Sequence, residues 1–328
     1  MPDNALPSPA SLPPAATGEV SLWRRFTATL GRWMAGGFVP FPVHRWEWVL
    51  MRIAFAALVM HTFMDWHPFK YASQPAPVGI ATLVDLSFLH RPGMFEFFRG
   101  LGAVGLTVYI LGFGLRFVLP VLALASTMIY TYSNSQGFTH HGVQLVTLVL
   151  IGQSLVAWWW WWKQRQGARD IASALPLPLQ SYMVYYSTGI IAFSYVISAV
   201  TKITNSKGMW VLNAKYLCIE IVKSQRLNYY GDLDPAQKMD PPVAVWLLQH
   251  PLAATVLFGS GFFLECFAFV ALRDRIWAFI IGVSLIAMHE SISWIMELDF
   301  HNHEALVLIF LINLPFWFAR LAFPRALR

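Results

Sequence analysis

Residues 143–162, VQLVTLVLIGQSLVAWWWWW, carry no charged side chain. A helix of this length is about 30 Å long, which matches the hydrocarbon thickness of a bilayer. Its tryptophans end directly before Lys163, at a place where indole rings favour the membrane–water interface. The stretch therefore predicts a helix that spans a membrane.

The rest of the 328-residue chain has the same character. Hydrophobic residues make up 57% of it and charged residues only 12%, against roughly 25% charged residues in a soluble domain. We therefore predict an all-α, polytopic membrane bundle of about eight spans, with an amphipathic connector at residues 203–250. The spans are predicted at residues 46–64, 98–115, 117–132, 143–162, 182–201, 251–272, 276–294 and 304–320.

The two ends of the chain differ from the transmembrane domain, which we predict over residues 46–322. Residues 1–20 are rich in Pro, Ala and Ser and predict a disordered tail. Residues 21–45 predict an interfacial helix, because apolar side chains recur at helical spacing beside arginines over residues 22–34. Residues 323–328 are predicted to be a cytoplasmic tail.

Lysines and arginines indicate the orientation. Thirteen of them fall on one side of the predicted spans, and eight on the other, where they are spread through two long loops. Since basic residues collect on the cytoplasmic side, both termini are predicted to be cytoplasmic. The net charge of +6 then reflects topology, and we expect no nucleic acid as a partner.

Ionisable side chains gather near the predicted outer side of the bundle. Such groups are costly inside a bilayer unless they face the bundle interior or a water-filled cavity. We therefore predict a functional cavity that opens outward. Its candidate side chains are His61, Asp65, His67, His140, His141, Lys202, His289, Glu290, Asp299, His301, His303 and Glu304.

Two of these side chains are candidates for proton transfer. His141 lies closer to the apolar run than His140, and an imidazole can transfer a proton or stabilise an oxyanion near neutral pH. Lys202 shares a helix face with Ser198, four residues earlier. It is either a lysine that burial deprotonates, and that acts as a base, or one whose ammonium group snorkels to the interface. The sequence leaves these two interpretations open.

Three further predictions concern a buried histidine, a pair of candidate metal ligands and an ion pair. His289 lies about 13 residues into its span, so it is predicted to be intramembrane and to face the cavity. His301 and His303 are weak metal-ligand candidates, because an HxH pattern defines no metal geometry without further ligands, and a solvated loop is favoured. Arg52 and Glu265 lie at equal predicted depth, which predicts a structural ion pair between the first and sixth spans.

Four segments follow one another along the chain: Met51-Arg52-Ile53, Gly114-Leu115-Arg116, Phe138-Thr139-His140-His141, and Ala199-Val200-Thr201-Lys202-Ile203 with Trp210 downstream. In this order they resemble segments of the vitamin K-dependent gamma-carboxylase and its bacterial relatives, the horizontally transferred transmembrane (HTTM) domain family. His289 falls where a histidine is expected in the seventh span of that family. The resemblance covers residues 46–320.

The resemblance implies a quinone enzyme. In the carboxylase, a lysine deprotonates reduced vitamin K, and oxygen converts the quinol to an epoxide through a strongly basic intermediate. A glutamate gamma-proton is then removed and carbon dioxide adds. By resemblance, Lys202 is the base and His141 assists at the reacting centre. We assign to the bound quinone a group of four residues, His140, His289, Glu290 and Ser198.

The chain also departs from the family. Thr139-His140 stands where the family has Asn-Asn, and Thr201 stands where it has a lysine. The residues up to Arg328 hold no counterpart of the large lumenal domain with which the carboxylase recognises its protein substrate. The resemblance therefore implies quinone chemistry more directly than carboxylation of a peptide.

The expected setting follows from these observations. We expect an integral protein of a bacterial inner membrane with its active face in the periplasm. Its expected partners are membrane lipid, a reduced vitamin K or menaquinol-type quinone, and a peptide or small-molecule carboxyl acceptor. Two alternatives stay open, a non-enzymatic quinone- or lipid-binding membrane subunit and a histidine-ligated haem or metal protein.

Overall fold

A computed structural model describes residues 37–64, 77–136, 141–166, 177–233, 242–296 and 298–323. The chain divides into two units, residues 1–38 and 39–328, and all that follows concerns the second. The predicted tail over residues 1–20, the core of the predicted interfacial helix over residues 22–34, and residues 324–328 lie outside the described residues. Residues 37–44, which we assigned to the interfacial segment, are not helical.

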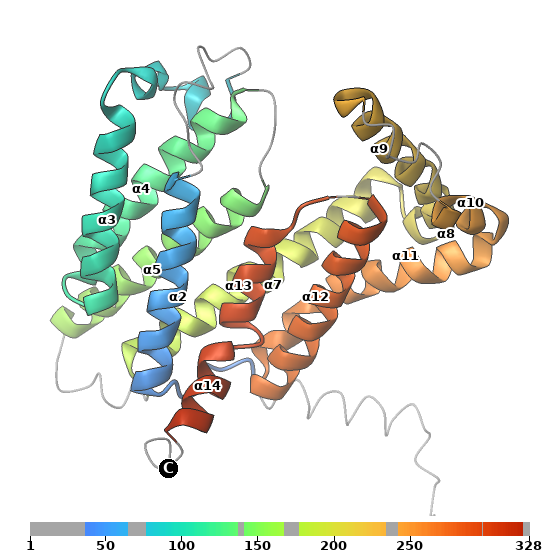
Figure 1. Cartoon of the computed structure of the whole chain (residues 1–328). Coiled ribbons are helices and arrows are strands. Elements are labelled where there is room, and N and C mark those ends of the chain that lie inside the picture. Colours follow the sequence, from blue (N-terminus) through green and yellow to red (C-terminus); the bar gives the residue numbers. More distant parts are fainter. Residues whose placement is uncertain are drawn as a thin grey trace, which may run out of the picture. The chain divides into compact units, whose positions relative to one another are not determined.

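The described residues form helices and contain no strand (Figure 1). Six of the described helices are long and apolar enough to cross a membrane. Two further pairs of helices pass the same test only when each pair is taken together, so the described residues contain six to eight candidate spans. The six long helices are α2 (Arg45–Met64), α3 (Met94–Leu111), α4 (Leu115–Asn134), α5 (His141–Gln166), α7 (Leu179–Asn205) and α12 (Arg275–Met296).

The two pairs are sharply bent. Helix α10 (Pro242–Gln249) meets α11 (Pro251–Cys266) at 108°, and α13 (His301–Phe310) meets α14 (Leu314–Ala322) at 46°. Asn313 explains the second bend, because it has a left-handed backbone with φ 60° and its side chain accepts a hydrogen bond from the backbone N–H of Phe316. A new helix therefore begins there rather than continuing α13.

The short turns also have physical causes. The chain reverses between α3 and α4 at Gly112 and Gly114, whose φ angles are 82° and 57°, a region that glycine adopts without steric cost. We placed this turn at Arg116, which instead lies inside α4. Pro120, in the second turn of α4, does not end the helix.

The predicted amphipathic connector is largely helical. It contains α8 (Trp210–Asn213), the 3₁₀ turn η4 (Ala214–Tyr216), α9 (Leu217–Asp232) and α10. Three other 3₁₀ turns are η2 (Gly79–Thr82) and η3 (Ser87–His90), in the loop before α3, and η5 (Ala268–Leu272), which follows α11.

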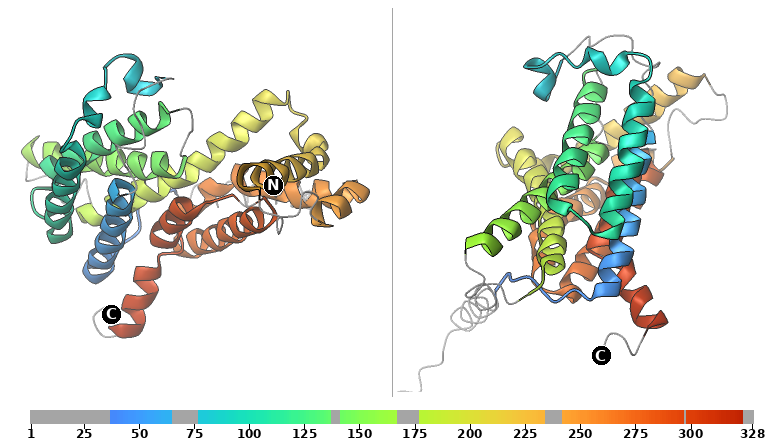
Figure 2. Two further views of the ribbon diagram at one scale, coloured as in Figure 1. Left: turned by 45° about the horizontal axis from the view of Figure 1, so that its top comes forward. Right: turned by 90° about the vertical axis from the view of Figure 1, so that its left-hand side faces the viewer.

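Among the described helices, α13 touches α2, α5, α7 and α12 as well as α14, which follows it in the chain. Helices α3, α4 and α5 follow one another in contact, and α5 packs on α7 (Figure 2). Helix α11 packs on α7 and α12. The bundle thus places the carboxyl-terminal parts of α7 and α11 together, away from α2.

Hydrogen bonds identify the two ends of the bundle. At one end, the N–H of Val43 donates to Ser181 at the start of α7 over 3.0 Å. At the other end, the N–H of Val78 donates to Ser135 after α4 over 3.2 Å, and Gly142 of α5 lies against Asn302 of α13. The starts of α5 and α13 therefore lie at the same end as the last residues of α4.

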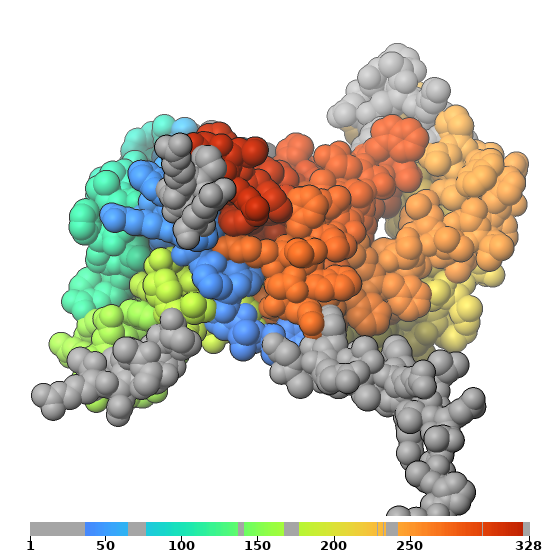
Figure 3. Space-filling model, turned by 90° about the horizontal axis from the view of Figure 1, so that it is seen from below, coloured from blue at the N-terminus to red at the C-terminus, as the bar shows by residue number. Residues whose placement is uncertain are grey.

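A buried charged junction holds the first of these ends together. The carboxylate of Glu47, fully buried in α2, accepts hydrogen bonds from both terminal nitrogens of Arg275, at 2.5 and 2.9 Å, and from the amide of Asn313 at 2.7 Å. The junction joins α2 to α12 and α14, which Figure 3 shows meeting on one face. Sequence reasoning missed it, because Glu47 and Arg275 each sit at a helix start, where charged residues are common.

Candidate functional site

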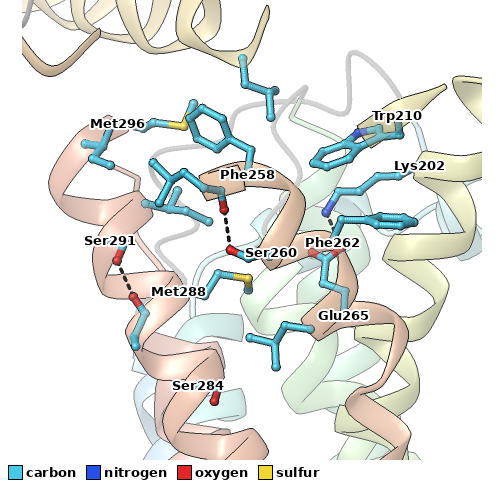
Figure 4. A pocket seen from close by; sticks show the side chains of 17 residues that line it. Lys202, Trp210, Phe258, Ser260, Phe262, Glu265, Ser284, Met288, Ser291 and Met296 are labelled. Carbon is cyan, nitrogen blue, oxygen red and sulfur yellow. Dashed lines mark hydrogen bonds and ion pairs between the residues drawn. The ribbon is translucent and has the colours of Figure 1, made fainter. Parts of the chain in front are cut away.

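A cavity of about 630 Å³ lies between α11 and α12 (Figure 4). The last turn of α7, α8 and the start of α9 contribute Lys202, Trp210 and Leu217 to its wall. Among the residues that line it, Lys202 and Glu265 are the only charged ones. The described lining is therefore mostly apolar, with one charged pair and a few serines.

Lys202 and Glu265 form an ion pair across the wall of this cavity. The side chain of Lys202 is 30% exposed and that of Glu265 only 8%. Ser198, one turn before Lys202 on α7, donates to the other carboxylate oxygen over 3.4 Å. Both oxygens of the buried carboxylate therefore have a donor, which a charge in an apolar setting needs.

Trp210 holds the ammonium group from another side. The Nζ atom of Lys202 lies 5.3 Å from the centre of the Trp210 ring, and this ring stacks on Phe262 of α11 at 5.4 Å. An aromatic face attracts a cation, so the indole stabilises the ammonium group at the cavity wall. The ammonium group of Lys202 therefore has two partners at the cavity wall, a carboxylate and an aromatic ring, and does not simply extend to the membrane interface.

The predicted pair of Arg52 and Glu265 is wrong. Glu265 instead pairs with Lys202 because α11 packs on α7. Arg52 donates to the backbone carbonyl of Tyr109 over 3.2 Å and lies 5.6 Å from the ring centre of Trp48. Equal depth in the membrane says nothing about which helices are neighbours.

The remaining polar lining consists of serines on α11 and α12. Ser260, Ser284 and Ser291 each donate their hydroxyl proton to a backbone carbonyl of their own helix, over 2.6 to 2.9 Å. Their oxygens retain lone pairs that can accept a hydrogen bond from a ligand. Met288 and Met296 add flexible, polarisable side chains that adapt to an apolar ligand.

A second polar group lies beyond the cavity, around His289 of α12. His289 is 3% exposed, and its Nε2 lies 3.4 Å from the hydroxyl of Tyr195 on α7. Its ring stacks on Phe300 at 4.6 Å and meets His303 edge-on at 5.7 Å. His289 was predicted to face the cavity, but it does not line the cavity that contains Lys202.

Three buried polar atoms of this group make no hydrogen bond within the described part of the chain. They are Nδ1 of His289, Nδ1 of His303 and Oε1 of Glu304. Sequence reasoning singled out His289 and the run from residue 299 to 304, and it missed Tyr195. The signal for Tyr195 is its spacing, since Tyr195, Ser198 and Lys202 share one face of α7.

The other predicted site residues are not gathered at the cavity. His141 is exposed at the start of α5, with Nδ1 3.3 Å from Gln144, and it does not line the cavity. His61 and Glu290 are exposed, and Ser198 reaches the cavity only through Glu265. The residues outside the described part include Asp65, His67 and His140.

The weak metal candidate His301 lies at the surface, near two carboxylates. His301 is 86% exposed and lies 3.5 Å from Asp299 and 3.9 Å from Glu304. Among the residues that the structure describes, no group of three His, Cys, Asp or Glu side chains is placed to hold a metal ion.

No family model, curated protein or solved structure matches this chain.

Proposed function

We propose that the cavity between α11 and α12 binds a quinol-type lipid, and that the pair of Lys202 and Glu265 removes a proton from its hydroxyl group. The observation that carries this proposal is one charged pair on the wall of a mostly apolar cavity of about 630 Å³. Ligand cavities of small molecules commonly measure several hundred Å³ and combine an apolar lining with a few polar groups.

A bound quinol supplies a weakly acidic hydroxyl group and a ring that can be oxidised. In the proposed step, the carboxylate of Glu265 takes a proton from the ammonium group of Lys202, which leaves a neutral amine facing the cavity. The amine accepts the hydroxyl proton and becomes an ammonium group again. Its charge, with the face of Trp210 behind it, then stabilises the anion that remains.

The resemblance to the carboxylase extends the proposal. By that resemblance, the deprotonated quinol would react with oxygen and drive carboxylation of a peptide or small-molecule acceptor. The reaction would take place at the periplasmic face of a bacterial inner membrane. Lys202 supports this extension, because it is the residue that the resemblance assigns as the base. His141 supports it less, since it lies outside the lining of the cavity.

The experiment measures quinone binding and quinol-dependent oxygen uptake by the purified protein in lipid nanodiscs. Lys202→Arg keeps the charge but cannot supply a neutral amine, because a guanidinium group does not deprotonate in proteins. We expect it to bind quinone and to lose turnover. Lys223→Arg is the matched control, since Lys223 forms an exposed pair with Glu220 and neither residue lines the cavity. Full turnover of the Lys202→Arg variant would show that Lys202 is not the base.

The second candidate is a membrane subunit that binds quinone or lipid without turning it over. It is favoured by the partners of Lys202, since a carboxylate and an indole that hold an ammonium group in place can serve binding alone. If this candidate is correct, the unaltered protein binds quinone without taking up oxygen, and the Lys202→Arg variant binds quinone as tightly as the unaltered protein.

A further inference from the structure

We propose that Tyr195, His289 and His303 form a proton path between the Lys202–Glu265 pair and the exposed histidines at the starts of α5 and α13. This inference rests on the proposed function, because it says where the proton goes after it leaves the ligand. An apolar ligand that fills the cavity would exclude water from the pair, so the proton then needs a polar route through the bundle.

The inner part of the path runs along α7. Tyr195, Ser198 and Lys202 lie on one face of this helix, three and four residues apart. Ser198 donates to Glu265 over 3.4 Å, and Tyr195 lies one turn before Ser198 on the same face. Tyr195 therefore stands between the carboxylate at the cavity and His289, which its hydroxyl group meets.

The middle of the path is the contact between Tyr195 and His289. The phenol oxygen lies 3.4 Å from Nε2 of His289, on a ring that is 3% exposed. The second ring nitrogen, Nδ1, makes no hydrogen bond within the described residues. Most ordered buried imidazoles use both nitrogens. Nδ1 of His289 is therefore available to release a proton toward His303 while Nε2 accepts one from Tyr195.

The outer part of the path leads to exposed side chains. The His303 ring is 5.7 Å from that of His289, and its own Nδ1 also lacks a partner among the described residues. Nδ1 of His303 lies beside Gly142 of α5, the residue that follows exposed His141. Glu304 lies 3.9 Å from the largely exposed His301. Chains of Asp, Glu and His side chains are the usual proton routes through membrane bundles.

The transfer balances without any electron movement. The ligand O–H bond breaks, and an N–H bond forms on Lys202 as Glu265 passes its own proton on toward Tyr195. The Tyr195 oxygen accepts a proton while it gives its own to Nε2 of His289. His289 then releases a proton from Nδ1, and His303 or Glu304 passes it to water at the exposed end of α13.

The experiment follows two signals after quinol is mixed with the protein in nanodiscs: the absorbance of the deprotonated quinol and the proton that reaches a pH-sensitive dye in the medium. Tyr195→Phe removes only the hydroxyl group, and His289→Phe keeps a ring that can stack on Phe300. We expect both variants to bind quinone within about twofold of the unaltered protein, and both to release the proton at least tenfold more slowly.

Two controls separate a path from a structural role. Tyr186→Phe changes an exposed tyrosine of the same helix, and His250→Phe changes an exposed histidine that stacks on Trp246; both should release the proton at the normal rate. In His289→Ala, added imidazole should restore fast release at constant thermal stability, which a purely structural role does not predict.

The outcomes distinguish the two proposals. If the unaltered protein binds no quinol or releases no proton, the proposed function fails and the path fails with it. If the unaltered protein releases the proton and both Tyr195→Phe and His289→Phe release it as fast, the proposed function stands. The path is then wrong, because the proton leaves through the mouth of the cavity.

Discussion

Lys202 and Glu265 differ in how much water they reach, and this difference predicts unequal effects of mutation. Lys202→Met leaves the carboxylate of Glu265, 8% exposed, without its cation. We expect it to lower the free energy of unfolding by about 3 to 5 kcal/mol, as is typical when one partner of a buried pair is removed. Thermal unfolding in detergent measures the change.

A double variant tests whether the unpaired carboxylate of Glu265 causes the loss of stability in Lys202→Met. Adding Glu265→Gln to Lys202→Met removes the unpaired charge, so part of the lost stability should return. The matched exposed substitution is Lys223→Met, which we expect to change stability by less than about 1 kcal/mol, because its pair with Glu220 is largely solvated. Strictly additive effects of the two cavity substitutions would exclude coupling between them.

For single residues, the sequence identified the important side chains better than it identified their partners. Lys202 and Glu265 both stood out, because a charge in an apolar run needs a reason. Their pairing could not be predicted, since it depends on α11 lying against α7, which no local pattern records. Tyr195 and Glu47 escaped attention because a tyrosine in a span and an acid at a helix start are ordinary features.

Among the elements, the turn between α3 and α4 offers a test of helix packing. Gly112 and Gly93 have nearly equal φ angles of 82° and 83°, so an alanine at either position costs about 1 to 2 kcal/mol in backbone strain. A Cβ atom at Gly112 would collide with the guanidinium group of Arg52, whereas one at Gly93 meets nothing within 4 Å. We therefore expect Gly112→Ala to be the more destabilising by about 1 kcal/mol, the value of a lost hydrogen bond.

Equal melting temperatures of Gly112→Ala and Gly93→Ala would contradict this packing of Arg52. A third variant, Gly100→Ala, lies within α3 with open space around it. It should leave stability unchanged or raise it slightly, because alanine favours a helix more than glycine does.

The junction between α2, α12 and α14 depends on the shape of a guanidinium group. Arg275 donates two hydrogen bonds to Glu47 and lies 4.3 Å from the ring centre of Phe316. Lysine cannot reproduce the fork or the stacking. We expect Arg275→Lys to lower the melting temperature clearly. Arg165→Lys, at an exposed position near the end of α5, should leave it almost unchanged. Similar melting temperatures for the two would show that only charge matters at the junction.

In the whole molecule, the apolar runs predicted the helices well and their bends poorly. Length and composition locate a span, because a bilayer needs about 20 apolar residues. They do not record the direction of the chain after a break, and so the 108° bend before α11 and the 46° bend after α13 were missed. The predicted count of eight spans agrees with the structure only if each bent pair crosses as one.

The orientation in the membrane can be tested by cysteine labelling. Both native cysteines are free, so a background with Cys218→Ser and Cys266→Ser is needed first. Single cysteines then replace Gln136, after α4, or His301, at the start of α13. Because α4, α5 and α13 meet at one end of the bundle, we expect a membrane-impermeant maleimide added outside the cell to label both.

Cysteines at Gln166 and Arg320, at the exposed far ends of α5 and α14, should react only after the membrane is permeabilised. Basic residues are concentrated at that end, which the charge rule assigns to the cytoplasm. A complete reversal of the labelling would overturn the orientation but keep the bundle. Labelling of Gln136 and His301 from opposite sides would overturn the bundle itself, because α5 and α13 could not then begin side by side.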